Sequence, residues 1–109
     1  LSAATVLDVN QLPVTGIGAQ IATSVKAGGD YTVGYIAKNT TNPYMVAQSA
    51  GVEAAGEAMG FTAITQAPTT ADSVEEQVQL MENMITQGVD AIIVHCADSN
   101  GIVTGVRKA

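Results

Sequence analysis

The chain has 109 residues, of which 47% are hydrophobic and 13% charged, a composition that favours one small folded domain over extended disorder. Ten acidic residues against four basic ones give a formal net charge of −6, which would repel a phosphate backbone, so we expect no nucleic-acid partner. An uninterrupted apolar stretch of about 18 residues, which a membrane span would need, does not occur in the sequence.

The first 30 residues, LSAATVLDVNQLPVTGIGAQIATSVKAGGD, are rich in small side chains and sustain neither a helical nor a strand period. They also lack the basic start and continuous apolar core of a signal peptide. The AGGD cluster at their end breaks regular structure directly before an apolar run. We therefore predict an extension or linker over residues 1–30 and a domain over residues 31–109.

The first half of that domain reads as a strand followed by a helix. TVGYIA, residues 32–37, is a continuous apolar run of strand length, and NPYMVAQSAGVEAAGEAMG, residues 42–60, has helical character. Pro43 suits the first turn of a helix, where its missing N–H is not needed, and Gly60 suits the position just past the end. Both ends of this helix are thus marked in the sequence.

The next pair repeats the pattern. FTAITQ, residues 61–66, predicts a second strand, and SVEEQVQLMENMITQG, residues 73–88, predicts a second helix. Ser73 and Glu76 match the S-x-x-E capping box, and Gly88 ends the helix. The apolar residues of this helix that we expect in the core are Val74, Val78, Met81, Met84 and Ile85.

A third buried strand is predicted over AIIVHC, residues 91–96, with a third helix beginning in residues 99–109. Cys96 is the only cysteine, so it closes no intramolecular disulfide, and its apolar setting predicts a buried structural thiol. Alternating strands and helices imply parallel pairing through right-handed crossovers. The fold class is therefore α/β, a three-layer α/β sandwich with strand order 2-1-3. We expect both faces of strands one and three to be covered and strand three to form an exposed edge.

In open α/β sheets, ligands bind beyond the carboxyl ends of the strands, near the point where strand order reverses. Here that rim consists of the loops 38–42 and 95–100, with the loop 66–72 beside them. The polar residues of these loops are also ordinary in turns and helix caps, so their chemistry alone is compatible with a ligand site and with plain loops. The rim side chains with donors, acceptors or an aromatic ring are Lys38, Asn39, Asn42, Tyr44, His95, Asp98 and Asn100.

Catalytic and cofactor templates fit poorly. GIGAQI has Ile21 where a dinucleotide fingerprint needs a small residue, and no triphosphate-binding G-x-x-x-x-G-K-[ST] loop occurs. His95 and Cys96 would point to opposite faces of a strand, and His95 is the only histidine. We expect no enzyme activity, no metal site and no cofactor.

Three ordered motifs carry a resemblance that covers residues 31–109. YTVGYIAKNTTNPYMVAQSAGVEAAGEAMG resembles the first strand, N-P-aromatic loop and first helix of the type-one periplasmic sugar-binding proteins. PTTADSVEEQVQLMENMITQGVDAIIV resembles their Q-x-x-x-(I/M)-x-x-x-(I/L)-x-Q-G-V-D-A-I-I-V block. DSNG and the apolar segment ending RKA resemble the next turn. Lys38 and PTTAD are most similar to the rhamnose and autoinducer-binding branch, and the NP-aromatic loop is shared with ribose-type relatives.

The resemblance implies a flavodoxin-like half of an amino-terminal lobe, so we expect a fragment or truncated form of a two-lobed protein. It further implies reversible capture of a monosaccharide or similar polyol, which is delivered to an ABC-type permease. The expected location is the periplasm or the cell exterior, and the native form could carry a lipid anchor. Carried over by position, the expected ligand contacts are Lys38, Asn42 and Tyr44. Met45 stands where many relatives have a second aromatic residue, and His95 and Asp98 lie on the same rim as further candidate contacts.

Two other functions remain open. The same lobe serves as the effector-binding core of lac-repressor-type regulators, and residues 5–25 faintly resemble a helix-turn-helix head, although Pro13 interrupts it and Lys26, just beyond it, is the nearest basic residue. The third function is a small α/β assembly unit without ligand. An exposed strand edge would in either case favour a homo-oligomer.

Overall fold

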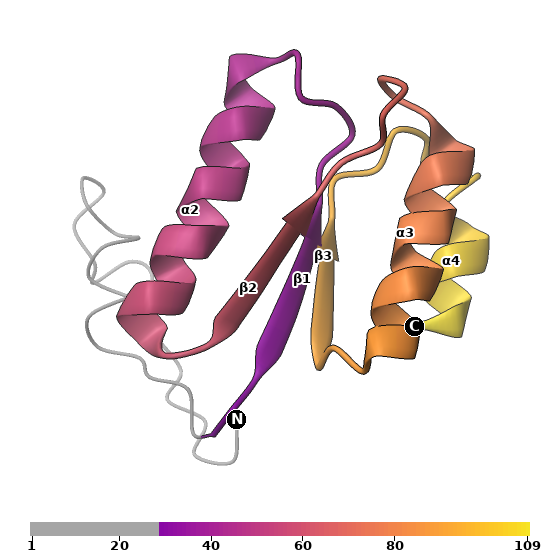
Figure 1. Cartoon of the computed structure of the whole chain (residues 1–109). Coiled ribbons are helices and arrows are strands. Elements are labelled where there is room, and N and C mark those ends of the chain that lie inside the picture. Colours follow the sequence, from indigo (N-terminus) through magenta and orange to yellow (C-terminus); the bar gives the residue numbers. More distant parts are fainter. Residues whose placement is uncertain (1–28) are drawn as a thin grey trace, which may run out of the picture.

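The computed structural model describes residues 29–109, so the predicted extension and the helix-turn-helix resemblance lie almost wholly outside the described residues. The described chain alternates strands and helices in the predicted order (Figure 1). Each predicted strand and helix is present, with ends shifted by one or two residues at most for the first five. The elements are β1 (Thr32–Ile36), α2 (Pro43–Met59), β2 (Thr62–Gln66), α3 (Val74–Gln87), β3 (Ala91–Val94) and α4 (Val103–Lys108).

The three strands form one parallel sheet in the order β2-β1-β3. In the register, Tyr35 of β1 lies beside Thr65 of β2 and Ile93 of β3. Helix α2 covers one face of the sheet, and α3 and α4 cover the other (Figure 1). The predicted three-layer α/β sandwich and its 2-1-3 strand order are therefore confirmed, and the carboxyl ends of β1 and β3 lie side by side.

Local capping explains where the two long helices begin and end. Pro43 occupies the first turn of α2, and the Asn42 side chain accepts a hydrogen bond from the Tyr44 N–H. Gly60 and Gly88 follow α2 and α3 in the left-handed conformation, at φ of 84° and 76°. Glycine adopts this conformation without a Cβ clash, and this explains why both helices end at a glycine. The predicted helix ends are confirmed at both positions.

The sheet separates two hydrophobic clusters because successive residues of β1 point to opposite faces. On the α2 face, Tyr35 packs with Ala37 and Met45. On the α3 face, Ile36 is fully buried among residues of α3 and the segment that leads into α4. The other buried members of this second cluster are Met81, Met84 and Ile102, which confirms the prediction that both methionines fill the core.

Two expectations for α3 are corrected. Ile85 is exposed, because the buried line of the helix runs through Gln77, Met81 and Met84. The capping box is formed only in part: the Ser73 hydroxyl accepts from the Glu76 N–H at 3.3 Å, but the Glu76 carboxylate bonds to residues of the preceding loop. That loop precedes the helix start, and its Thr69 and Thr70 groups donate to the carboxylate instead.

The prediction that β3 is covered on both faces was wrong for the described chain. Ile93 is 49% exposed on the α2 side, since α2 packs mainly against β2, at the opposite edge of the sheet. The strand also ends at Val94, so His95 and Cys96 belong to the following loop. Cys96 is exposed there, which overturns the expected buried thiol. Topology confirms that β3 is an edge of the described sheet.

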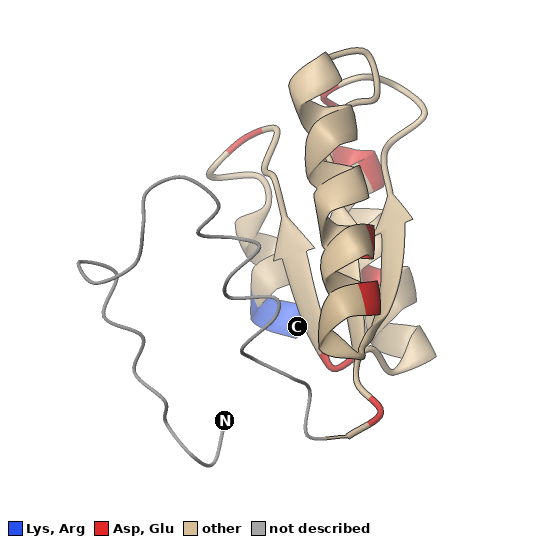
Figure 2. Cartoon of the chain, turned by 90° about the vertical axis from the view of Figure 1, so that its left-hand side faces the viewer, with Lys and Arg blue, Asp and Glu red and all other residues tan. Residues whose placement is uncertain are grey.

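The acidic residues are scattered along helices and loops in the view of Figure 2. Among the described residues, an ion pair joins Lys108 of α4 to Glu82 of α3; both side chains are well exposed, and such surface pairs contribute little to stability. Within the described part of the chain, no helix has the length and apolarity needed to cross a bilayer.

Candidate functional site

The structure brings Tyr44, at the start of α2, together with His95, in the loop after β3. Their rings meet edge to face, with centroids 6.4 Å apart and an interplanar angle of 79°. Tyr44 is 60% exposed and His95 is partly buried. These two residues mark the rim formed by the carboxyl ends of β1 and β3, the position at which an open parallel sheet binds its ligands.

The loop after β1 is held in shape by Asn39, which is almost fully buried. Its side-chain oxygen accepts from the Asn42 N–H at 3.1 Å, and its amide donates to the Asp72 carboxylate at 3.0 Å. The Asp72 N–H in turn donates to the Lys38 carbonyl at 2.8 Å. The loops after β1 and β2 are therefore locked to each other, which fixes the start of α2 and with it Tyr44.

A second buried amide, Gln77 of α3, ties the loop after β1 to the loop after β3. Its nitrogen donates to the carbonyls of Ala37 and His95, at 3.1 and 2.8 Å, and its oxygen accepts from the Ala97 N–H at 2.9 Å. Gln77 is 0% exposed, and its amide satisfies its own hydrogen-bonding groups through these three backbone partners. This one side chain therefore helps to fix the relative position of the two rim loops.

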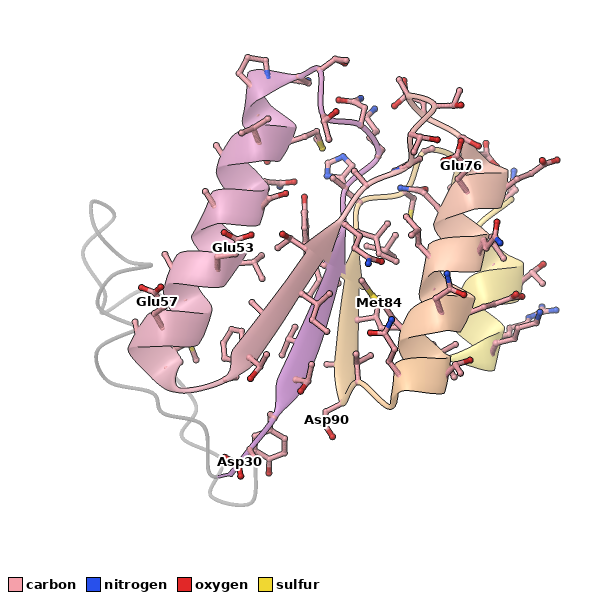
Figure 3. The ribbon with its side chains drawn as sticks, viewed as in Figure 1. Asp30, Glu53, Glu57, Glu76, Met84 and Asp90 are labelled. Carbon is pink, nitrogen blue, oxygen red and sulfur yellow. The ribbon has the colours of Figure 1, made fainter. Side chains whose placement is uncertain are left out.

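Glu76, one residue before Gln77, organises the third rim loop (Figure 3). Its carboxylate accepts from the Thr69 N–H and hydroxyl, at 2.7 and 2.8 Å, and from the Thr70 N–H at 3.1 Å. Hydrogen bonds from the Thr69 hydroxyl and backbone, then those from Thr70, hold the pKa of Glu76 below its ordinary value. The loop is shaped by a charged carboxylate at neutral pH.

The remaining predicted site residues lie on or near this rim with different surroundings. Lys38 is partly buried, and its ammonium group has no hydrogen-bond partner among the described residues. Met45 is buried against Tyr35 and Ala37. Asp98 uses one carboxylate oxygen to accept from the Asn100 and Gly101 N–H groups, at 3.0 and 2.6 Å. The Asn42 oxygen caps α2.

Sequence reasoning missed Gln48 and Gln77. Gln77 lies four residues before Met81, on the same face of α3. A polar residue on an otherwise apolar helix face is a sequence signal for a buried amide with backbone partners. Gln48 lies one turn after Tyr44 on α2 and is bonded to three rim side chains. No local pattern marks it, because its partners come from three separate elements.

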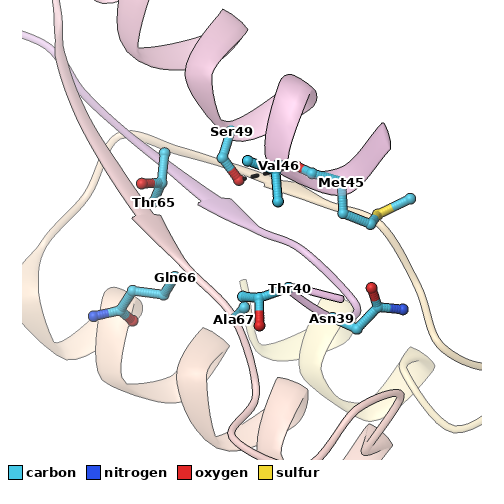
Figure 4. A pocket seen from close by; sticks show the side chains of 8 residues that line it. All are labelled: Asn39, Thr40, Met45, Val46, Ser49, Thr65, Gln66 and Ala67. Atoms are coloured by element: carbon cyan, nitrogen blue, oxygen red, sulfur yellow. Dashed lines mark hydrogen bonds between the residues drawn. The ribbon is translucent and has the colours of Figure 1, made fainter. Parts of the chain in front are cut away.

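A pocket of about 250 Å³ opens beside the rim, between α2 and the carboxyl ends of β1 and β2 (Figure 4). Several of its polar groups are already used within the protein: the Ser49 hydroxyl donates to the Met45 carbonyl, and the Thr65 hydroxyl donates to Glu53. It lies on the side of α2 that carries Met45 and Ser49, whereas Tyr44 faces His95. We therefore place the candidate site at Tyr44 and His95.

Comparison with known proteins decides the family. The family model described as "periplasmic binding protein domain" matches residues 33–109. The chain belongs to this family. The predicted resemblance is thereby confirmed, and the match begins one residue after the first residue of β1.

Individual relatives agree with this family assignment. The ribose import binding protein of Bacillus subtilis (strain 168) is 30% identical over 80 residues, which are 73% of this chain and 26% of the relative. The fructose import binding protein of Bifidobacterium longum (strain NCC 2705) is 27% identical over 88% of this chain and 29% of the relative. The chain thus spans less than a third of the curated relatives that it matches.

The solved structures include an ABC transporter solute-binding protein from Clostridium phytofermentas with bound L-rhamnose. It superposes with a TM-score of 0.69 at 31% identity, over 74% of this chain and 25% of that chain. Membership of the periplasmic binding protein family implies an extracytoplasmic location.

Proposed function

We propose that this periplasmic binding protein domain supplies one wall of a monosaccharide site and captures its ligand reversibly, without catalysis. The observation that carries the proposal is the exposed Tyr44 ring set edge to face against His95 at the carboxyl ends of β1 and β3. An aromatic ring with nearby donors and acceptors suits a polyhydroxylated ligand. Relatives named for ribose and fructose import and a relative with bound L-rhamnose support a sugar.

The whole protein would act as the solute-binding component of an ABC-type sugar uptake system, outside the cytoplasmic membrane and compatible with a lipid anchor. It would deliver its sugar to an ABC permease. Since the chain spans about a quarter of its relatives, the rest of the ligand's contacts would come from the part that the chain does not include. We therefore expect millimolar binding by this chain alone, because affinity falls about tenfold for every 1.4 kcal/mol of lost contact.

The test is a titration of the chain with ribose, rhamnose, allose and fructose, followed in amide proton–nitrogen NMR spectra. Saturable shifts at the rim are expected for at least one sugar. The residues expected to shift are Lys38, Asn42, Tyr44, Met45, His95 and Asp98.

A matched pair of variants makes the test specific. Tyr44→Leu removes the rim ring and should abolish the shifts. Tyr31→Leu removes a tyrosine of comparable exposure at the opposite end of β1 and should leave them unchanged. A well-dispersed spectrum that no sugar alters would reject sugar binding by this chain itself and leave two functions: a lobe that binds only together with a second lobe, or an assembly unit without ligand.

A further inference from the structure

One amide, Gln48, makes hydrogen bonds to three side chains at the rim. It bonds to the Tyr35 hydroxyl of β1 at 2.6 Å, to the Tyr44 hydroxyl at 3.1 Å and to His95 Nδ1 at 3.2 Å. Its partners come from a strand, a helix and the loop after a second strand. Gln48 is itself partly buried, and nothing in the family assignment explains this arrangement.

The orientation of the Gln48 amide follows from its shortest bond. A separation of 2.6 Å between Tyr35 Oη and Gln48 is normal for an O–H···O bond and shorter than the usual range for N–H···O, so the amide oxygen faces Tyr35. Burial, and then the neighbouring Tyr44, raise the pKa of Tyr35. The Tyr35 hydroxyl is therefore protonated at neutral pH and acts as the donor.

This orientation fixes the proton on His95. The Gln48 oxygen carries no hydrogen and can only accept, so the ring nitrogen 3.2 Å away, Nδ1, must carry the proton. In a neutral imidazole the other nitrogen, Nε2, is then an acceptor. Nε2 has no hydrogen-bond partner among the residues that the structure describes, and it does not appear among their buried unpaired atoms.

The same amide also holds Tyr44. Its nitrogen donates to the Tyr44 hydroxyl oxygen, which leaves the hydroxyl proton free to donate to another group. The Tyr44 ring is fixed edge to face against the His95 ring. The rim therefore offers one donor at Tyr44 Oη and one acceptor at His95 Nε2, on two rings in edge-to-face contact. A sugar hydroxyl both accepts and donates, so it can use both groups.

We propose that Gln48 is a positioning residue that selects the Nδ1-protonated tautomer of His95 and orients Tyr44, so that the two side chains together bind one hydroxyl group of a polyol. The tautomer is a property of the free chain, whereas the hydroxyl contact rests on the proposed sugar-binding function.

The tautomer is measurable without any ligand, because His95 is the only histidine of the chain. Long-range proton–nitrogen spectra of the imidazole ring, recorded without a polyhistidine tag at about pH 9, where an ordinary histidine is neutral, identify the protonated nitrogen. We expect it to be Nδ1. A ring protonated at Nε2 would overturn the proposal.

Three variants test the role of Gln48. Gln48→Met keeps the length of the side chain but cannot accept strongly, so the His95 proton should distribute over both nitrogens. Gln48→Glu retains an accepting oxygen and should restore Nδ1 protonation. Gln79→Met, at an exposed position of α3, is the matched control and should behave as the parent chain. An unchanged tautomer in Gln48→Met would refute the positioning role.

Sugar titrations of the same variants test the hydroxyl contact. Gln48→Met should weaken binding about tenfold, the equivalent of roughly 1.4 kcal/mol, and Gln48→Glu should recover part of the loss. If the parent chain binds no sugar while the tautomer is as expected, the proposed function and the hydroxyl contact fail but the tautomer selection stands. Sugar binding that Gln48→Met leaves unchanged would refute the hydroxyl contact and leave the proposed function intact.

Discussion

Single side chains hold the rim together. Gln77, itself fully buried, bonds to three backbone groups that belong to two different loops, and Asn39 joins the loops after β1 and β2. Both are amides, which present a donor and an acceptor from one planar group. At this scale the architecture of the site depends on hydrogen bonds whose loss would leave polar groups buried and unpaired.

Gln77→Leu is therefore expected to lower the free energy of unfolding by about 3 kcal/mol, because it removes the partners of the Ala37 and His95 carbonyls and of the Ala97 N–H. Urea denaturation followed by circular dichroism measures this. Gln79→Leu, at an exposed position of the same helix, is the control and should change stability by less than about 0.5 kcal/mol. Equal losses in the two variants would contradict the role of Gln77.

Glu76 should make stability depend on pH. Its pKa in the folded chain lies below the ordinary value of 4.5, so the stabilisation is complete above that value and is lost as the pH falls through the lower pKa of the folded state. We expect the stability difference between the parent chain and Glu76→Gln to be present at neutral pH and to shrink progressively below pH 4.5.

The control for Glu76 is Glu75→Gln in the same first turn of α3. The Glu75 side chain makes no hydrogen bond to the residues that the structure describes. Its stability difference from the parent chain should vary much less over the same pH range. Urea unfolding midpoints of the three chains, recorded from about pH 3 to about pH 7, measure these stability differences. A difference for Glu76→Gln that stays constant across that range would rule out the effect.

At the scale of elements, the close approach of α3 to β1 depends on a missing side chain. A Cβ on Gly34 would lie 2.3 Å from the sulfur of Met84, a fully buried residue (Figure 3). Glycine in a strand is otherwise unfavourable, so its presence here is explained by this contact. The sequence signal for it, a glycine inside an apolar strand, is visible in TVGYIA, but the partner is not.

Gly34→Ala should lower the free energy of unfolding by about 2 kcal/mol through overpacking. The same substitution at Gly51, where a Cβ of α2 would meet nothing, should be neutral or stabilise by up to about 1 kcal/mol. Combining Gly34→Ala with Met84→Ala should cost less than the sum of the single changes, since each relieves the other. Strict additivity in urea denaturation would disprove the contact.

Across the whole molecule, the described sheet has two edge strands, β2 and β3. β3 pairs only with β1 there, and Ile93 is exposed on the face that α2 leaves uncovered. An unpaired strand edge next to an exposed apolar side chain favours pairing with another chain. We expect this chain to self-associate through β3.

Ile93→Lys should weaken that association roughly tenfold or more, since a charge beside the edge opposes strand pairing. Sedimentation velocity over a range of concentrations measures it. Val106→Lys, at a similarly exposed position on α4, should leave the association unchanged. Monomeric behaviour of the parent chain at all concentrations would end the proposal of a homo-oligomer.

The sequence by itself determined the order of elements, the parallel sheet and the helix ends, because strand-length apolar runs, Pro43, Gly60, Ser73 and Gly88 act within a few residues of themselves. Only the tertiary structure decided which line of α3 is buried, that Cys96 is exposed, and that Gln48 and Gln77 hold the rim. Those outcomes depend on which distant element lies against each side chain. Local pattern carries no information about that neighbour, so burial and the partners of the buried amides emerge only when the layers pack.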